Sequence, residues 1–123
     1  IVERDGHIGH GAVLHGCRVG VNALIGMNAV IMDNAHIAES SIVGATAFVA
    51  AGFECAPRSL VVGSPASVKR ELSEKEVDWK SRGTLEYQQL AIRCRMSLEK
   101  TTALSEAEEN RPRIKVGKYE FKP

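Results

Sequence analysis

The stretch GHIGHGAVLHGC, residues 6–17, contains the repeat that decides the fold and three of the four histidines of the chain. Four of its positions are glycine, which disfavours a helix. His10 and His15 are five positions apart, and on a helix five residues turn through about 500°, so the two side chains would lie on different faces. The helical spacing for two metal ligands is i, i+4. If these histidines bind a metal, a different scaffold must present them.

Aliphatic residues recur at every sixth position through the first half of the chain. One step, from Leu14 to Val19, is five residues long. This period is typical of the hexapeptide class of β-helix and fits neither an amphipathic helix nor a hairpin meander. Three hexads make one triangular coil, so aliphatic side chains about 18 residues apart stack inside the prism. The predicted inward positions are Val2, Ile8, Leu14, Val19, Ile25, Ile31, Ile37, Val43, Val49, Cys55 and Val61.

The distribution of charge divides the chain into parts. Residues 1–60 contain three Lys or Arg, and thirteen follow. We therefore expect an all-β solenoid over residues 1–66 and an α-helical C-terminal part, residues 67–100, that packs on it. Residues 101–123 contain too few apolar side chains for a core and are expected to form an extended or disordered tail.

Within the C-terminal part, Ser73 and Glu76 have the spacing of a capping box, which predicts the start of a helix. Gly83 is expected to break that helix. The pattern therefore predicts two helices, over roughly residues 73–80 and 85–98, with an apolar stripe on the second.

Composition excludes several classes of protein. The chain has 123 residues, 44% hydrophobic and 25% charged, which is ordinary for a globular protein. A formal net charge of +1 gives no indication of nucleic-acid or membrane binding, and no apolar run approaches the roughly 18 residues of a membrane span. Three cysteines without a CxxC pair are typical of reduced thiols, so we expect a cytoplasmic protein.

The hexad register places the histidines on the outside of the prism. His10 follows the inward Ile8 by two positions and His15 follows the inward Leu14 by one, so both should point outward on either side of a corner. Five extended residues cover about 16 Å, so one chain cannot easily bring both imidazoles to one ion. Neighbouring chains of a rotational trimer could do so. By spacing alone, two surface histidines without a metal are an equally good interpretation.

The motif IGHGAVLHGCRVG, residues 8–20, followed by LIGM at 24–27, resembles the γ-class carbonic anhydrase family. With residues 62–66 and 79–87, it is most similar to the branch of phenylacetate-degradation and carnitine-operon proteins. The resemblance implies a left-handed parallel β-helix and a homotrimer with zinc at each subunit interface. His15 would be a ligand from one chain and His10 a ligand from its neighbour.

The same resemblance implies that the chain is N-terminally incomplete, because the third ligand of the family is a histidine that would lie upstream of Ile1. No catalytic residue beyond the metal ligands is then expected within the chain. His7 has no counterpart among the family's ligands, and we interpret it as a surface or interface residue with a possible supporting role beside the ligands. Fe²⁺ or Co²⁺ would suit three imidazoles as well as Zn²⁺ does.

Three functions follow as hypotheses. The resemblance implies a zinc enzyme in which metal-bound hydroxide attacks a small molecule, either CO₂ or a CoA thioester in aromatic or carnitine catabolism. The first alternative is a hexapeptide acyl-CoA-dependent acyltransferase, with an interface histidine as general base and no zinc. The second is a non-catalytic accessory subunit. We also expect the 123-residue chain alone to be nearly inactive, because it would offer two imidazoles where the family uses three.

Overall fold

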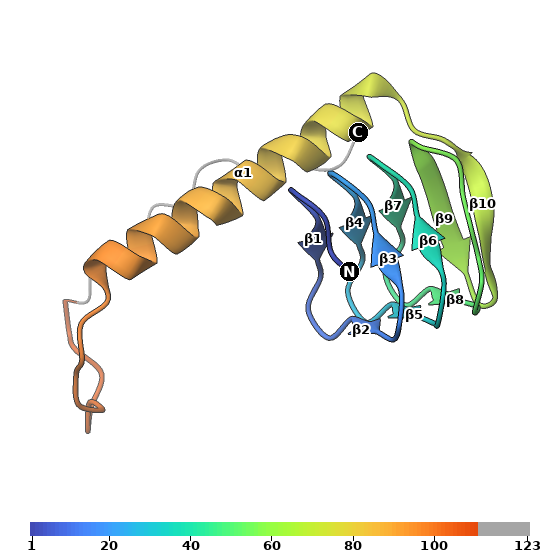
Figure 1. The fold of residues 1–123 in the computed structure, drawn as a ribbon. Coiled ribbons are helices and arrows are strands. Elements are labelled where there is room, and N and C mark those ends of the chain that lie inside the picture. Colours follow the sequence, from blue (N-terminus) through green and yellow to red (C-terminus); the bar gives the residue numbers. More distant parts are fainter. Residues whose placement is uncertain (111–123) are drawn as a thin grey trace.

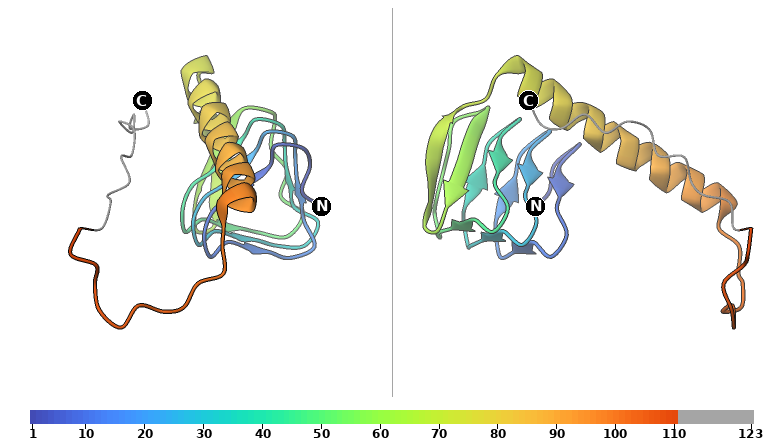
Figure 2. Two further views of the ribbon diagram at one scale, coloured as in Figure 1. Left: turned by 90° about the vertical axis from the view of Figure 1, so that its left-hand side faces the viewer. Right: turned by 180° about the vertical axis from the view of Figure 1, so that it is seen from behind.

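The computed structural model of the chain describes residues 1–110, which form a triangular parallel β-helix followed by one long helix (Figure 1). Viewed along its axis, the β-helix shows stacked coils with a triangular outline (Figure 2). Residues 101–110 are exposed and contain no helix or strand, and the remainder of the predicted tail, 111–123, lies outside the described residues. The solenoid predicted from the six-residue period is confirmed.

Three sheets form the sides of the prism, and consecutive strands belong to different sheets. The first sheet has the order β1-β4-β7-β9-β10, the second β2-β5-β8, and the third β3-β6. All pairs are parallel except β9 with β10. The strands are β1 (His7–Ile8), β2 (Val13–Leu14), β3 (Arg18–Val19), β4 (Leu24–Ile25), β5 (Val30–Ile31), β6 (His36–Ile37), β7 (Ile42–Val43), β8 (Phe48–Val49), β9 (Ser59–Gly63) and β10 (Ala66–Glu71).

The core is the stack of inward aliphatic side chains that the hexad register predicts. Ile8 pairs with Ile25, and Ile25 with Val43, one coil above another. Most members of the set are fully buried, with small alanines between them. At the β1 end of the stack, Val2 and Ile8 are exposed. The fully buried members are Val19, Ile25, Ile31, Ile37, Val43, Val49 and Val61.

The corners of the prism require a backbone that turns sharply, and the structure shows how the sequence provides it. Residues with φ between 54° and 70° recur at the corners, and asparagine occupies three successive ones at Asn22, Asn28 and Asn34. Asparagine tolerates this left-handed conformation because its short side chain bonds locally. Gly26 has another role, since a Cβ there would lie 2.4 Å from the backbone nitrogen of Ala45 in the next coil. Its lack of a side chain permits the coils to stack.

The C-terminal helix differs from its prediction. The capping box is present, with Ser73 as N-cap and Glu76 bonded back to it, but one helix, α1 (Glu74–Ser97), continues through Gly83. The prediction of two helices is therefore wrong. Docking on the prism explains the continuity, because α1 is anchored on both sides of the glycine through Lys80 and Thr84, which are both buried.

Strand pairing also continues past the predicted boundary at residue 66, because β10 folds back on β9 as an antiparallel hairpin. The chain then passes through the buried Leu72 into α1. From there α1 crosses the coils toward β1 and extends beyond them (Figures 1 and 2).

Candidate functional site: two histidine corners flanking one sheet

His10 and His15 are both exposed, as the register predicts, but they do not flank a single corner. The corner at Gly11, with φ of 69°, and the whole of β2 separate them, and His15 immediately precedes the next corner, Gly16. The two histidines therefore occupy successive corners, with the β2-β5-β8 sheet between them. We call these the His10 corner and the His15 corner.

The His15 corner contains a partner that sequence reasoning did not identify. Asp33 stands one coil later, and its Oδ2 lies 2.9 Å from Nδ1 of His15. The carboxylate can only accept, so Nδ1 donates the hydrogen and Nε2 is left unprotonated when the ring is neutral. Both side chains are accessible, at 67% and 47% exposure. The coil at this point is 17 residues long, as the pairing of Val13 with Val30 shows, so Asp33 is one residue past the position stacked on His15 and the register did not single it out.

Stacking leaves little freedom at this corner. A Cβ at Gly16 would lie 2.4 Å from Oδ1 of Asp33, and the φ of Gly16 is 63°. A side chain is excluded there both by conformation and by contact. The glycine after His15 thus gives the Asp33 carboxylate room to reach the imidazole.

The sheet between the two corners has an apolar outer face. Val13 pairs with Val30, and Val30 with Phe48, so these three side chains form a column across β2, β5 and β8. Their neighbours Leu14, Ile31 and Val49 point into the core, so the column faces out. Val13 is 50% exposed and Phe48 is 38% exposed. Met27, near the His10 corner, adds a further exposed apolar side chain.

His7 lies on the first sheet, where α1 covers the prism. Its Nδ1 is 3.1 Å from Oγ1 of Thr84, and its ring meets that of Tyr87 edge-on at 5.2 Å. Burial lowers the pKa of His7, and the positive charges of Lys80 and His10 lower it further. Thr84 is 77 residues away in sequence, and no local pattern indicates this contact.

The described residues do not assemble a complete metal site within one chain. Over residues 1–110 there is no group of three or more His, Cys, Asp or Glu side chains arranged to hold a metal ion. His15 is nevertheless oriented to bind a metal through Nε2, because its other ring nitrogen, Nδ1, is held by the Asp33 carboxylate. A metal at His10 or His15 would require donors from outside these residues or from another chain.

Comparison with known proteins shows what the chain is similar to. No family model matches the chain. The carnitine operon protein CaiE of Salmonella typhimurium is 58% identical over all 123 residues, as is that of Salmonella dublin, and the chain spans 62% of the length of each. A hexapeptide transferase family protein from Anaplasma phagocytophilum superposes with a TM-score of 0.70 at 31% identity, over 76% of this chain and 55% of that one. The chain is thus similar over its whole length to CaiE, and it shares the parallel β-helix fold with the hexapeptide transferase family protein.

A second solved structure is similar to the chain. This is a putative acetyltransferase from Bacillus cereus, with a TM-score of 0.73 and 34% identity over 75% of this chain and 54% of that one. None of these comparisons bears on zinc or on carbonic anhydrase activity. Among the described residues, α1 is not apolar enough along its length to cross a membrane.

Proposed function

We propose that the chain forms a homotrimer with a divalent metal at each interface, held by His15 of one subunit and His10 of the next. The observation that supports this most strongly is the hydrogen bond between His15 Nδ1 and Asp33. Ligating histidines almost always donate their other ring hydrogen to a carboxylate, carbonyl or water. The pair therefore has the arrangement of a metal ligand with its orienting partner.

The outward apolar column of Val13, Val30 and Phe48 supports assembly through the same region. Contiguous exposed apolar surface is typical of an interaction site. Because His10 and His15 stand at the two edges of this sheet, a rotational contact can bring the His10 corner of one subunit against the His15 corner of its neighbour. In the proposed trimer this contact repeats around a three-fold axis, so that one site forms three times.

The third donor would come from outside the described residues. A zinc ion with three imidazole ligands supplies a Lewis acid and water of lowered pKa, and Fe²⁺ or Co²⁺ are alternatives. CO₂ and acyl-CoA thioesters are the small-molecule substrates that fit this chemistry. In this assignment His10 and His15 bind and orient, and Asp33 holds the imidazole of His15 in position.

Acyl transfer is a second candidate, favoured by the description of the Bacillus cereus neighbour as a putative acetyltransferase. The same hydrogen bond serves this chemistry, because an imidazole fixed through Nδ1 can accept the proton of an attacking hydroxyl or amine at Nε2. His15 would then act without a metal, and His10 would have no required part. Metal dependence therefore separates the two candidates.

The test is zinc content and oligomeric state in the purified protein that includes the source of the third donor. We expect about one zinc per subunit in a trimer, and its loss in the His10→Ala and His15→Ala variants. Asp33→Asn should weaken zinc binding by about 10–100-fold. His36→Ala, which removes an exposed histidine on β6, is the control and should change nothing. Undiminished zinc in the double variant His10→Ala, His15→Ala would contradict the proposal, and full acyl transfer in excess chelator would establish the alternative.

A further inference from the structure

His7 is the histidine that the proposed site leaves unused, and it has the most constrained surroundings of the described histidines. It is partly buried between β1 and α1, with Thr84 against one ring nitrogen and Tyr87 against its edge. Thr84 itself is buried, so its hydroxyl has little access to water. The proton positions in this contact therefore follow from the protein groups present.

The hydroxyl of Thr84 makes two contacts and has one hydrogen. Oγ1 lies 3.2 Å from the carbonyl oxygen of Lys80 and 3.1 Å from Nδ1 of His7. If the hydroxyl donates to His7, two oxygens that cannot bond to one another remain 3.2 Å apart. If it donates to the Lys80 carbonyl, it can accept from Nδ1–H, and both contacts become hydrogen bonds. The second arrangement makes one more hydrogen bond in a buried position and is the more stable.

This arrangement places the single hydrogen of a neutral His7 ring on Nδ1 and leaves the lone pair on Nε2. His15 reaches the same state through a different partner, the Asp33 carboxylate. Burial and the nearby charge of Lys80 lower the pKa of His7, which favours the neutral ring. His7 begins β1, and the His10 corner follows directly after this two-residue strand, so the two histidines lie three positions apart on the same coil.

We propose that Thr84 is a positioning residue that fixes the proton of His7 on Nδ1, and that His7 Nε2 thereby serves as a proton acceptor for a small molecule bound at the His10 corner. Helix α1 is then part of the site, because it supplies the group that sets this tautomer. The first half stands on the hydrogen-bond geometry alone. The second half rests on the proposed function of the His10 corner.

The tautomer is measured by long-range ¹⁵N–¹H correlation of the histidine rings in the 123-residue chain without metal. We expect the Nδ1–H form for His7 and its retention in Thr84→Ser, which keeps the hydroxyl. Thr84→Val, which keeps the shape, should shift His7 toward the Nε2–H form. Ser81→Ala is the control, because it removes a contact between α1 and Asn22 without touching His7. An Nε2–H tautomer in the unaltered protein, or an unchanged tautomer in Thr84→Val, would overturn the assignment.

Two substitutions, each of which retains only one side of the imidazole, test whether Nε2 accepts a proton. His7→Asn can still donate to Thr84 but has nothing at the Nε2 position, whereas His7→Gln places an amide near that position. We expect His7→Asn to keep the thermal midpoint and zinc content while kcat falls about 100-fold, in the usual range for loss of a general base, and the acid limb of the pH profile disappears. Unchanged kcat and pH profile in a normally folded His7→Asn would reduce His7 to an anchor for α1. Absence of zinc and activity in the unaltered protein that includes the source of the third donor would refute the proposed function but leave the tautomer result intact.

Discussion

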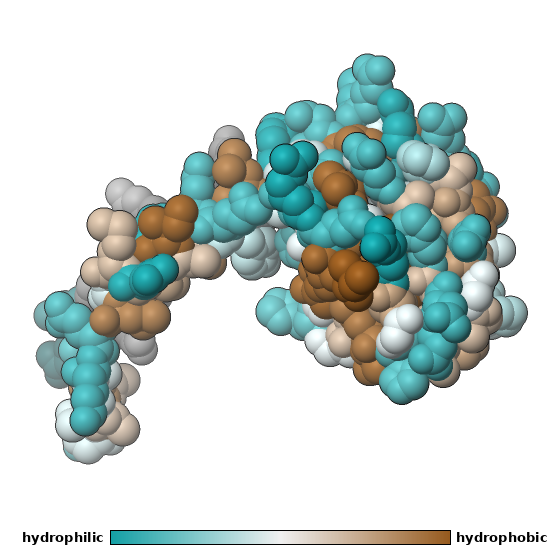
Figure 3. All heavy atoms as spheres, viewed as in Figure 1, coloured by the Kyte–Doolittle hydropathy of each residue, from teal (hydrophilic) through white to brown (hydrophobic). Residues whose placement is uncertain are grey.

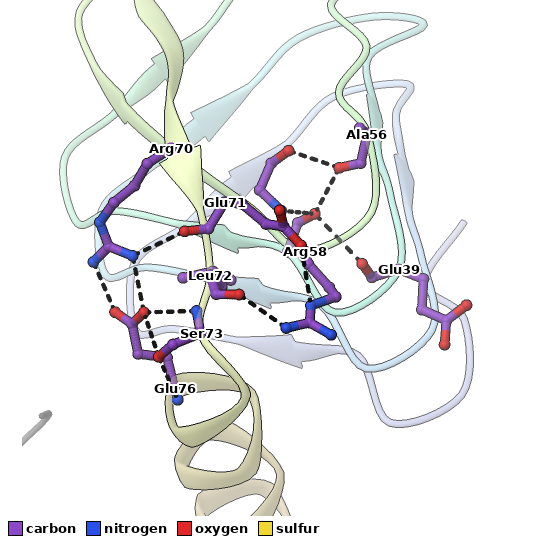
Figure 4. A network of polar contacts seen from close by, with 10 residues as sticks. Glu39, Ala56, Arg58, Arg70, Glu71, Leu72, Ser73 and Glu76 are labelled. Atoms are coloured by element: carbon purple, nitrogen blue, oxygen red, sulfur yellow. Dashed lines mark hydrogen bonds and ion pairs between the residues drawn. The ribbon is translucent and has the colours of Figure 1, made fainter.

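The two ends of the β-helix are built differently. At the β10 end, the antiparallel hairpin, the buried Leu72 and a set of charged contacts close the stack (Figure 4). At the β1 end, Ile1, Val2 and Ile8 are exposed by 75%, 47% and 36%. A hydrophobic patch is visible there near the N-terminus (Figure 3). One end terminates the repeat, whereas at the other the first inward aliphatic side chains of the described residues are exposed.

A reversal of strand direction closes the β10 end. Consecutive coils exchange backbone hydrogen bonds in both directions, as from His7 to the Ala23 carbonyl and from Asn28 back to the His10 carbonyl. At the far end, β10 runs antiparallel to β9, and the ladder shifts register between Val68 and Arg70. A reversed strand with a bulge does not offer the edge that another parallel coil needs. In this solenoid the closed end is therefore specified by residues outside the six-residue repeat.

Charges complete the closure. Arg70 donates two hydrogen bonds of 2.8 Å to the carboxylate of the buried Glu76, which also accepts from the Ser73 backbone (Figure 4). The hydrogen bonds from Arg70, then that from Ser73, hold the pKa of Glu76 well below its usual range. Arg58 donates to the Leu72 carbonyl at 3.1 Å. The helix cap and the coil cap therefore share one carboxylate.

The largest expected effect comes from Leu72→Ala compared with Ile8→Ala. Leu72 is 2% exposed, so its truncation should leave a cavity and lower the free energy of unfolding by about 3 kcal/mol. Ile8 is already 36% exposed, so its truncation should lower the free energy of unfolding by less, about 1 kcal/mol. Urea unfolding midpoints measure both. Equal losses would show that the two ends are equally closed.

Glu76→Gln should lower the free energy of unfolding by a smaller amount, about 2 kcal/mol at pH 7, because hydrogen bonds to a charged group are lost. Since the folded-state pKa of Glu76 is lowered, its contribution is present above the ordinary value of 4.5 and is lost as pH falls below it. Unfolding of the two proteins at a series of pH values should therefore converge in acid. A constant difference down to pH 2 would contradict this role.

Lys80 connects α1 to the coils near the β1 end, and its substitution tests that contact. Its Nζ donates to the Asp5 carbonyl at 2.8 Å and to Asn22 at 2.7 Å, and burial lowers its pKa to about 8. Between about 8 and the ordinary 10.5 the unfolded chain binds more protons, so stability should rise with pH, by at most ~1.4 kcal/mol per unit. Lys80→Met should remove this rise in thermal unfolding scans. A rise of the same size in the variant would assign it to other groups.

The smallest effect on stability is expected at the open end itself. Ile8→Lys should change the free energy of unfolding by less than about 1 kcal/mol, because the side chain reaches solvent. It should reduce self-association, since it interrupts the exposed apolar end. Sedimentation velocity over a range of concentrations measures this change, with Val68→Lys on the closed end as the matched control. Equal reduction by both variants would show that association does not depend on the open end.

The sequence by itself determined the solenoid, its register and the first turn of α1. A six-residue period repeated over many hexads allows one packing, because a shift in register would expose the aliphatic positions. The outward direction of His10 and His15 follows from the same register. The capping box was equally predictable, because Ser73 and Glu76 interact within one helical turn.

Only the tertiary structure decided the partners of the histidines and the length of α1. Asp33 meets His15 because a coil of the right length stacks it there, and Thr84 meets His7 because α1 crosses the first coil at one particular angle. Gly83 stays helical because contacts of Lys80 and Thr84 with the prism outweigh a propensity cost of about 1 kcal/mol. Local patterns specify which face a residue occupies, whereas contacts between distant segments depend on how the finished elements pack.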